Sequence, residues 1–181
     1  LVGCGLHGAW AARCLAAAEY GPGICFDPDP DAAGRLAGEL GWEAGSLEEA
    51  LAQDVVTCVT PGNQPVLRAG DVQPGIHINM LGADGPGKAE AEPEAVAACR
   101  LFCDEWAQAS HGGELAGAVD AGLVSREDVT DLGAVLTGAE RGRSGPQETT
   151  LFDSTGLAIQ DLALCHAVLG GGAEPSGKVA L

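Results

Sequence analysis

A glycine turn at the start of the chain constrains the fold more than any other feature. Gly3, Gly5 and Gly8 have the spacing GxGxxG, and an Ala-rich helical pattern over 9–19 follows them directly. Glycines at this spacing permit a tight turn and a close backbone approach to a pyrophosphate, which then lies at a helix N-terminus. The chain contains 28 glycines, so a purely structural turn is the alternative. The helical pattern that follows favours a dinucleotide-binding turn.

Strand-like and helical segments alternate along the rest of the chain. Apolar runs typical of strands lie at 24–27, 54–60, 76–81, 100–104 and 149–153. Helical patterns lie at 31–40, 46–52 and 92–98, residues 105–138 are predicted to be mostly helical, and 139–148 form a polar loop. Ser154 or Thr155 is predicted to cap a last helix that runs to residue 169. The alternation predicts one α/β domain over 1–169, a Rossmann-type doubly wound, mostly parallel sheet, followed by a Gly-rich tail at 170–181.

The end of the second predicted strand carries a carboxylate. Asp27 follows Gly8 by 19 residues. At this position in a dinucleotide-binding fold, an acidic residue bonds the ribose 2′-hydroxyl and repels the additional phosphate of NADP. The sequence therefore predicts NAD as the cofactor, with NADP less favoured.

A second carboxylate follows the strand at 76–81. Asp84 lies in a Gly/Pro loop two residues after Gly82, and Lys88 comes four residues later. Because ligands of open α/β sheets bind beyond the carboxyl ends of the strands, Asp84 is a candidate catalytic acid or base. An Asx turn is the structural alternative for Asp84. Lys88 could neutralise a phosphate, neutralise the carboxylate, or be a solvated charge.

Charge and cysteine content exclude several classes of protein. The formal net charge is −17, which makes nucleic acid and anionic membranes poor partners. No apolar run has transmembrane length, and there is no signal peptide. The seven cysteines have no metal-ligand spacing and most lie among apolar neighbours, so we expect small buried side chains in a reducing, cytoplasmic compartment and no bound metal. His77 is expected to be a satisfied core residue, and His7 is a candidate phosphate contact.

The first residues also suggest that the chain is part of a longer polypeptide. Only Leu1 and Val2 precede the glycine turn, and there is no initiator Met. A core strand usually needs about five residues. We therefore expect the chain to begin inside its first strand.

The chain resembles the cofactor domain of the ornithine cyclodeaminase and mu-crystallin family. The similarity extends in order through nearly the whole sequence, and its most distinctive parts are the loop around Asp84 and the segment 150–162. The matching segments are Gly3 to Gly8, Phe26-Asp27 with Pro30-Asp31-Ala32, Ser46 to Ala50, Asp54-Val55-Val56, Thr60-Pro61, His77-Ile78-Asn79, Gly82 to Lys88, Gly113-Glu114-Leu115 and Thr150 to Leu162.

The resemblance implies roles for particular residues. Asp84 matches the active-site aspartate of the family. The cofactor contacts that it implies are Gly3, Gly5, His7, Gly8, Asp27, Thr60, Leu81, Lys88 and Thr155, with Gly156 as a substrate contact. It also implies a homodimer and a separate substrate and dimerisation domain, built mainly from a preceding part of the chain that is absent here. The last helix of the family is expected to continue where Gly170 to Gly172 stand.

These implications give a functional expectation. The preferred function is that of an NAD-dependent oxidoreductase or cyclodeaminase that acts on a small amino or imino acid. Hydride transfer from the α-carbon to NAD⁺ gives an imine, which is hydrolysed, cyclised or reduced again, with Asp84 moving protons or orienting water or amine. The alternatives are a mu-crystallin-like protein that binds a nicotinamide nucleotide with little turnover, or an inactive fragment of such an enzyme.

Overall fold

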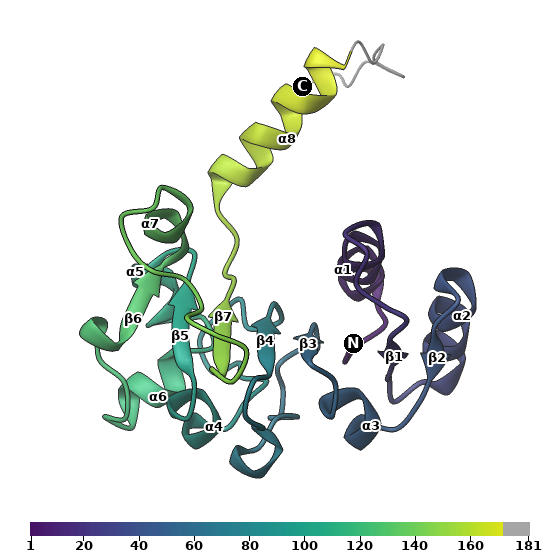
Figure 1. Cartoon of the computed structure of the whole chain (residues 1–181), viewed down its shortest axis with the longest axis horizontal. Coiled ribbons are helices and arrows are strands. Elements are labelled where there is room, and N and C mark those ends of the chain that lie inside the picture. The colour runs from purple at the N-terminus through teal and green to yellow at the C-terminus, as the bar shows by residue number, and fades with distance from the viewer. Residues whose placement is uncertain (172–181) are drawn as a thin grey trace.

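The computed structural model describes residues 1–171, which form a parallel sheet with helices on both faces (Figure 1). Five strands pair in the order β3-β4-β7-β5-β6, and every pairing is parallel. Two shorter strands, β1 and β2, form a second parallel pair. The strands are β1 (Ile24–Cys25), β2 (Glu43–Ala44), β3 (Val55–Cys58), β4 (His77–Met80), β5 (Arg100–Cys103), β6 (Val129–Asp131) and β7 (Thr150–Asp153).

Val2 joins the two sets of strands. It forms parallel bridges to Phe26, directly after β1, and to Cys58 of β3. Its N–H donates to Thr57 O at 2.9 Å, and its carbonyl accepts from Val59 N at 2.8 Å. The strand order reverses at Val2, because β1 and β2 lie on one side of it and β3 and β4 on the other. The result is the predicted doubly wound, parallel fold.

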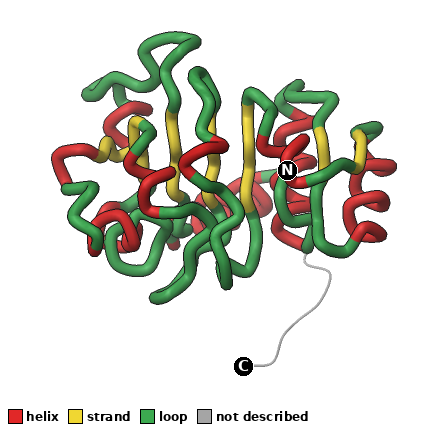
Figure 2. The backbone as a smooth tube through the Cα atoms, turned by 90° about the horizontal axis from the view of Figure 1, so that it is seen from below, coloured by secondary structure: helices red, strands yellow, loops and turns green. Residues whose placement is uncertain are grey.

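The helices cover both faces of the row of strands. In Figure 1, α1 and α7 lie on one side of the strands, and α3, α4 and α6 lie on the other. Figure 2 shows the central strands running side by side through the middle of the molecule. The helices are α1 (Leu6–Ala17), α2 (Pro30–Leu40), α3 (Leu47–Leu51), α4 (Pro93–Ala97), α5 (Trp106–Ala109), α6 (Ala116–Asp120), α7 (Leu132–Leu136) and α8 (Ala158–Gly170), with 3₁₀ turns at Ala69–Asp71 and Arg126–Asp128.

Two helix ends follow the sequence signals closely. Gly41 ends α2 in the left-handed conformation, with φ of 67°, as a C-terminal glycine does. Ser46 caps α3: its hydroxyl accepts from Glu49 N, and the Glu49 carboxylate accepts from Ser46 N. This capping box satisfies two backbone donors that the helix itself leaves free.

The core lies between the sheet and its helices. Its buried strand residues are Val56, Cys58, Ile78, Met80, Leu101, Cys103 and Leu151. Of the cysteines, Cys25 is also buried as predicted, whereas Cys14 and Cys165 are exposed. None of the helices within residues 1–171 is long and apolar enough to cross a membrane.

Two local predictions are wrong. Residues 105–138 contain a strand, β6, which pairs with the neighbouring β5 over three residues and is too short to show an alternating pattern. Helix α8 begins at Ala158 rather than at Ser154 or Thr155, because the Thr155 hydroxyl bonds Asp104 instead of capping the helix.

The end of the described chain extends away from the body of the domain. Helix α8 projects from the sheet in Figure 1, and each of its residues is exposed. It ends at Gly170, at the start of the predicted glycine run. The rest of the predicted Gly-rich tail, 172–181, lies outside the described residues.

Candidate dinucleotide-binding site

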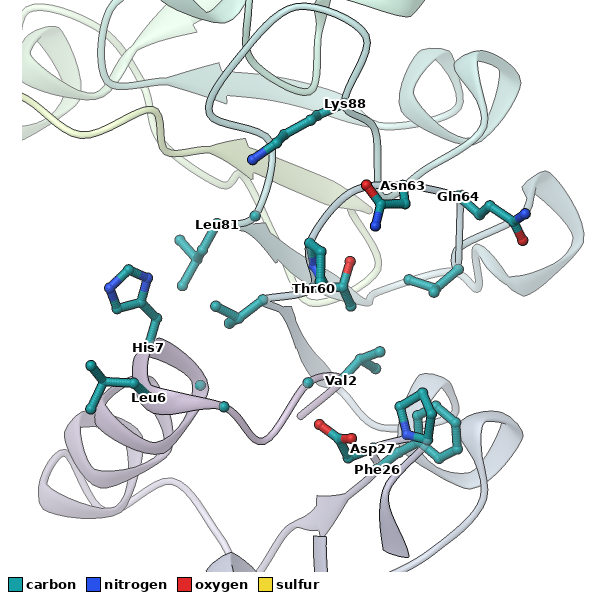
Figure 3. Close-up of a pocket in the computed structure, with 18 of the residues that line it drawn as sticks. Val2, Leu6, His7, Phe26, Asp27, Thr60, Asn63, Gln64, Leu81 and Lys88 are labelled. Atoms are coloured by element: carbon teal, nitrogen blue, oxygen red, sulfur yellow. The ribbon is translucent and has the colours of Figure 1, made fainter. Parts of the chain in front are cut away.

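A cavity of about 780 Å³ lies where the strand order reverses (Figure 3). The glycine turn, the end of β1, and the loops after β3 and β4 form its walls. In open α/β sheets this reversal point, beyond the carboxyl ends of the strands, is where ligands bind. The structure brings together most of the predicted site residues in its lining: Gly3, Gly5, His7, Gly8, Asp27, Thr60, Leu81, Asp84 and Lys88.

The three glycines of the turn have three different surroundings. Gly3 has φ of 97°, and a Cβ there would lie 2.4 Å from Val59 O. A Cβ on Gly8 would lie 1.9 Å from Gly3 O, so the first turn of α1 can approach the strand only without a side chain. Gly5, by contrast, has no atom within 4 Å of its Cβ position.

This arrangement leaves open space at the start of α1. Gly5 immediately precedes the helix, whose first backbone N–H groups have no acceptor within the helix. Free N–H groups and the helix dipole favour an anion at this point. The turn therefore fits the pyrophosphate of a dinucleotide.

Asp27 is fixed at the edge of the same cavity by two backbone hydrogen bonds. Its carboxylate accepts from Cys4 N at 2.7 Å and from Asp29 N at 2.9 Å. The first bond attaches the carboxylate to the glycine turn, and Figure 3 shows Asp27 beside Val2 and Phe26. Ionised carboxylate oxygens have further lone pairs, so Asp27 can still accept from a hydroxyl group.

Asp84 and Lys88 form an ion pair at the opposite wall. Lys88 Nζ lies 2.5 Å from Asp84 Oδ1. The hydrogen bond from Lys88 holds the pKa of Asp84 below its usual value, so this exposed carboxylate is ionised at neutral pH. Lys88 thus neutralises the Asp84 carboxylate in this structure, and its role as a cofactor contact stays a prediction. His7, from the first turn of α1, lines the same cavity.

Thr155 and Gly156 lie outside the lining of this cavity. Both backbone N–H groups donate to Asp104 Oδ2 at 2.9 Å, and the Thr155 hydroxyl donates to Asp104 Oδ1 at 2.9 Å. Asp104 directly follows β5 and thus holds the segment between β7 and α8. The cofactor and substrate roles of Thr155 and Gly156 stay predictions.

Sequence reasoning assigned no role to three buried carboxylates, one of which, Glu90, bonds two loops that line the cavity. Glu90, Glu114 and Asp153 are each at most 2% exposed. Burial raises the pKa of Glu90, and it raises the pKa of Glu114 and of Asp153 to about 7. Glu114 and Asp153 lie within segments that match the family, but the match assigned them no role, and Glu90 follows Lys88 by two residues in the same loop.

His77 has partners for both ring nitrogens. Nδ1 lies 2.8 Å from Thr150 Oγ1, and Nε2 lies 3.1 Å from Asn79 Oδ1. Burial lowers the pKa of His77, which favours the neutral ring. It is a satisfied polar residue, as expected, although it lines a second cavity rather than the core. Within residues 1–171, no group of three or more His, Cys, Asp or Glu side chains could hold a metal ion.

The fold and the site together define a Rossmann-type domain with a dinucleotide-binding turn. A sequence profile of the ornithine cyclodeaminase/mu-crystallin family matches residues 42–170, and the chain belongs to that family. The resemblance found in the sequence is thereby confirmed.

Two curated relatives illustrate the similarity. The chain is 46% identical to an alanine dehydrogenase of Archaeoglobus fulgidus over 122 residues, which cover 67% of this chain and 38% of that protein. It is 38% identical to an iminosuccinate reductase of Paracoccus denitrificans over 176 residues, which cover 93% of this chain and 55% of that protein. The chain thus matches 55% of the length of the iminosuccinate reductase and 38% of the length of the alanine dehydrogenase.

Solved structures give the same result. An archaeal alanine dehydrogenase dimer with bound NAD superposes with a TM-score of 0.87 at 35% identity, covering 99% of this chain and 59% of that one. The iminosuccinate reductase of Paracoccus denitrificans in complex with NAD⁺ superposes with a TM-score of 0.83 at 35% identity, covering 93% of this chain and 54% of that one.

Proposed function

We propose that this chain is the cofactor-binding part of an NAD-dependent enzyme that acts on a small amino or imino acid. The observation that carries the proposal is the cavity at the point where the strand order reverses. Its lining contains Gly5, which has open space beside it, the Asp27 carboxylate and the Asp84–Lys88 ion pair. Relatives named as an alanine dehydrogenase, an iminosuccinate reductase and an ornithine cyclodeaminase support the substrate class.

NAD is the cofactor that fits the residues present. The backbone at Gly5 and the start of α1 would hold the pyrophosphate, and Asp27 would accept from a ribose hydroxyl. The 2′-phosphate of NADP would meet the Asp27 carboxylate and be repelled. When bound, NAD⁺ supplies the hydride acceptor that interconverts an amino acid and its imine. The two similar structures that contain NAD support this choice.

Asp84 is the proposed catalytic residue of this chain. The Asp84 carboxylate is ionised, so it can orient a substrate amine or water, accept a proton from it and later return that proton. Pairing with Lys88 lowers the pKa of Asp84 and so makes this carboxylate a weaker base than an unpaired aspartate. Asp84 lies beyond the end of β4 and lines the cavity, which supports this role. Net oxidation and cyclisation release a proton from the substrate amine or from water, whereas imine reduction consumes one, so each reaction needs a group that moves protons.

We further propose that the substrate-binding and dimerisation domain lies outside this chain. The share of the relatives that the chain covers supports this proposal, as does the dimer in the archaeal structure. All seven cysteines are free, which supports a cytoplasmic location. Lyase activity of the cyclodeaminase type belongs to the same proposal.

Cofactor binding tests the proposal in the complete protein. Calorimetric titration should give tighter binding of NAD(H) than of NADP(H). Asp27→Ser should weaken NAD(H) binding roughly tenfold to a hundredfold, because a hydrogen bond to a charged group contributes about 1.5–3 kcal/mol. In this variant, the difference in affinity between NAD(H) and NADP(H) should become smaller or change sign.

A matched control removes a similar carboxylate elsewhere. Asp128 is exposed and also accepts a backbone N–H, from Ser125. Asp128→Ser should leave both cofactor affinities unchanged. Tighter binding of NADP(H) by the wild-type protein would refute the assignment of Asp27.

A further inference from the structure

The buried carboxylate of Glu90 connects the ends of two neighbouring strands. Oε1 accepts from Thr60 N at 2.5 Å, and Oε2 accepts from Gly82 N at 2.7 Å. Thr60 lies two residues after the end of β3, and Gly82 lies two residues after the end of β4. Charge-assisted hydrogen bonds of this kind are about twice as strong as neutral ones. One side chain thus fixes the positions of two loops that line the cavity.

Glu90 is itself held in place from several directions. Its N–H donates to both Glu114 carboxylate oxygens at 2.9 Å, and its carbonyl accepts from Val66 N at 2.7 Å and Leu67 N at 3.0 Å. The Glu90 side chain is 0% exposed. With backbone and carboxylate both bonded, this residue has little freedom to shift.

The close fit extends to Gly82. A Cβ at this position would lie 2.6 Å from the Glu90 carboxyl carbon and 2.3 Å from Thr60 O. Gly82 therefore permits the strand end and the carboxylate to approach each other. Asp84 follows Gly82 by two residues. The two hydrogen bonds of the Glu90 carboxylate to Thr60 N and Gly82 N, here called the clamp, therefore act directly on the loop that carries the proposed catalytic carboxylate.

A buried carboxylate is costly for a fold that needs only stability. Removing an ionised group from water is unfavourable unless hydrogen bonds compensate, and apolar side chains of similar size often serve a core as well or better. What the carboxylate adds here is two directed bonds to two loops of one cavity. Such bonds are a means of fixing loop geometry to within a fraction of an ångström.

We propose that Glu90 is a positioning residue of the nucleotide site: it holds the Thr60 and Gly82 loops so that Asp84 meets the bound cofactor and substrate. This inference rests on the proposed function, because it assumes that NAD(H) occupies the cavity. Glu90 is buried and is not part of the cavity lining. Its effect passes through the backbone of the two loops.

Glu90→Gln in the complete protein is the direct test. The amide keeps one acceptor oxygen but presents an NH₂ group to the second backbone N–H, so the clamp opens at one strand end. A misplacement of about 1 Å can cost on the order of a hundredfold in rate. We expect NAD(H) affinity and single-turnover hydride transfer each to fall at least tenfold, whereas the variant still unfolds cooperatively.

Glu49→Gln is the matched control. Glu49 Oε2 also accepts a backbone N–H, from Ser46 at 2.7 Å, but it lies in the capping box of α3 and not in the cavity lining. The same chemical change there should leave NAD(H) affinity and hydride transfer unchanged. Equal losses in both variants would overturn the positioning role, since the loss would then reflect general destabilisation.

Amide hydrogen exchange in the wild-type protein provides a test that does not depend on a folded variant. The N–H groups of Thr60 and Gly82 should be strongly protected, and fast exchange of either would overturn the proposed clamp. Failure of the proposed function has a different signature, namely a wild-type protein that does not bind NAD(H). If the wild type binds NAD(H) and Glu90→Gln retains its affinity and hydride-transfer rate, the positioning role alone fails.

Discussion

Replacing Asp153 by Asn should stabilise the protein at alkaline pH. Asp153 ends β7, a central strand of the sheet, and is 1% exposed. Its Oδ2 accepts from Leu115 N at 3.2 Å, whereas Oδ1 has no hydrogen-bond partner among residues 1–171. A buried carboxylate oxygen without a partner disfavours ionisation.

The structure gives the sign and the size of the effect. Burial raises the pKa of Asp153 from 3.8 to about 7, and the charge of Asp104 adds to the rise. The folded state therefore holds this proton more tightly than the unfolded chain does. The stabilising contribution of the protonated carboxyl is complete below the unfolded pKa, near 4, and is lost as the pH rises through about 7.

Each pKa unit corresponds to about 1.4 kcal/mol, so ionising Asp153 costs the fold at most about 4 kcal/mol at pH 8. Asn mimics the protonated form and avoids this cost. The Asn NH₂ group would occupy the place of Oδ1, which has no hydrogen-bond partner among residues 1–171, and this unpaired donor offsets about 1–2 kcal/mol of the gain. We therefore expect Asp153→Asn to raise the free energy of unfolding by about 2 kcal/mol at pH 8 and to change it little at pH 4.

Urea unfolding of the complete protein without cofactor, at pH 4 and pH 8, measures this difference. Asp128→Asn, which alters an exposed carboxylate, is the control. Glu114, whose pKa burial also raises to about 7, keeps titrating in both variants, so the pH dependence should weaken without vanishing. An equal gain at both pH values, or a carboxyl of Asp153 that titrates near pH 4 by NMR, would refute the reasoning.

Two further substitutions test the site in the complete protein. Asp84→Asn should lower kcat by about two to four orders of magnitude with little change in NAD(H) affinity, and near-normal kcat in a folded variant would favour the Asx-turn alternative. Gly8→Ala should abolish NAD(H) binding in a calorimetric titration, because the new Cβ would lie 1.9 Å from Gly3 O. Gly34→Ala, at an exposed helix position with open space, is its control, and unchanged binding by Gly8→Ala would contradict the packing argument.

Local signals were sufficient to predict the cofactor side of the cavity. The glycine turn, the strand-end position of Asp27 and the loop after β4 each depend on neighbours close in sequence. The rule that ligands bind beyond the carboxyl ends of parallel strands then placed Asp84 in the same cavity as the turn. These residues were predictable because one short segment determines each position.

The hydrogen bonds of the buried carboxylates Glu90 and Glu114 were not predictable, because they depend on contacts between residues far apart in the sequence. In a chain with 26 acidic residues, Glu90 and Glu114 cannot be distinguished from surface charges by sequence alone. Glu90 bonds the backbone of Thr60, 30 residues away, and Glu114 bonds the backbone of Glu90, 24 residues away. Thr155 was mistaken for a helix cap for the same reason: its partner, Asp104, is 51 residues away.

The distribution of charge in the site explains how so acidic a chain can accept an anionic cofactor. With a net charge of −17, the protein has no general attraction for phosphate. The open face of Gly5 and the first N–H groups of α1 supply short-range partial charges instead, and these need no basic side chain. Lys88, the lysine in the cavity lining, is paired with Asp84. On the proposed function, the cation pairs with a carboxylate, and the backbone N–H groups would hold the phosphates.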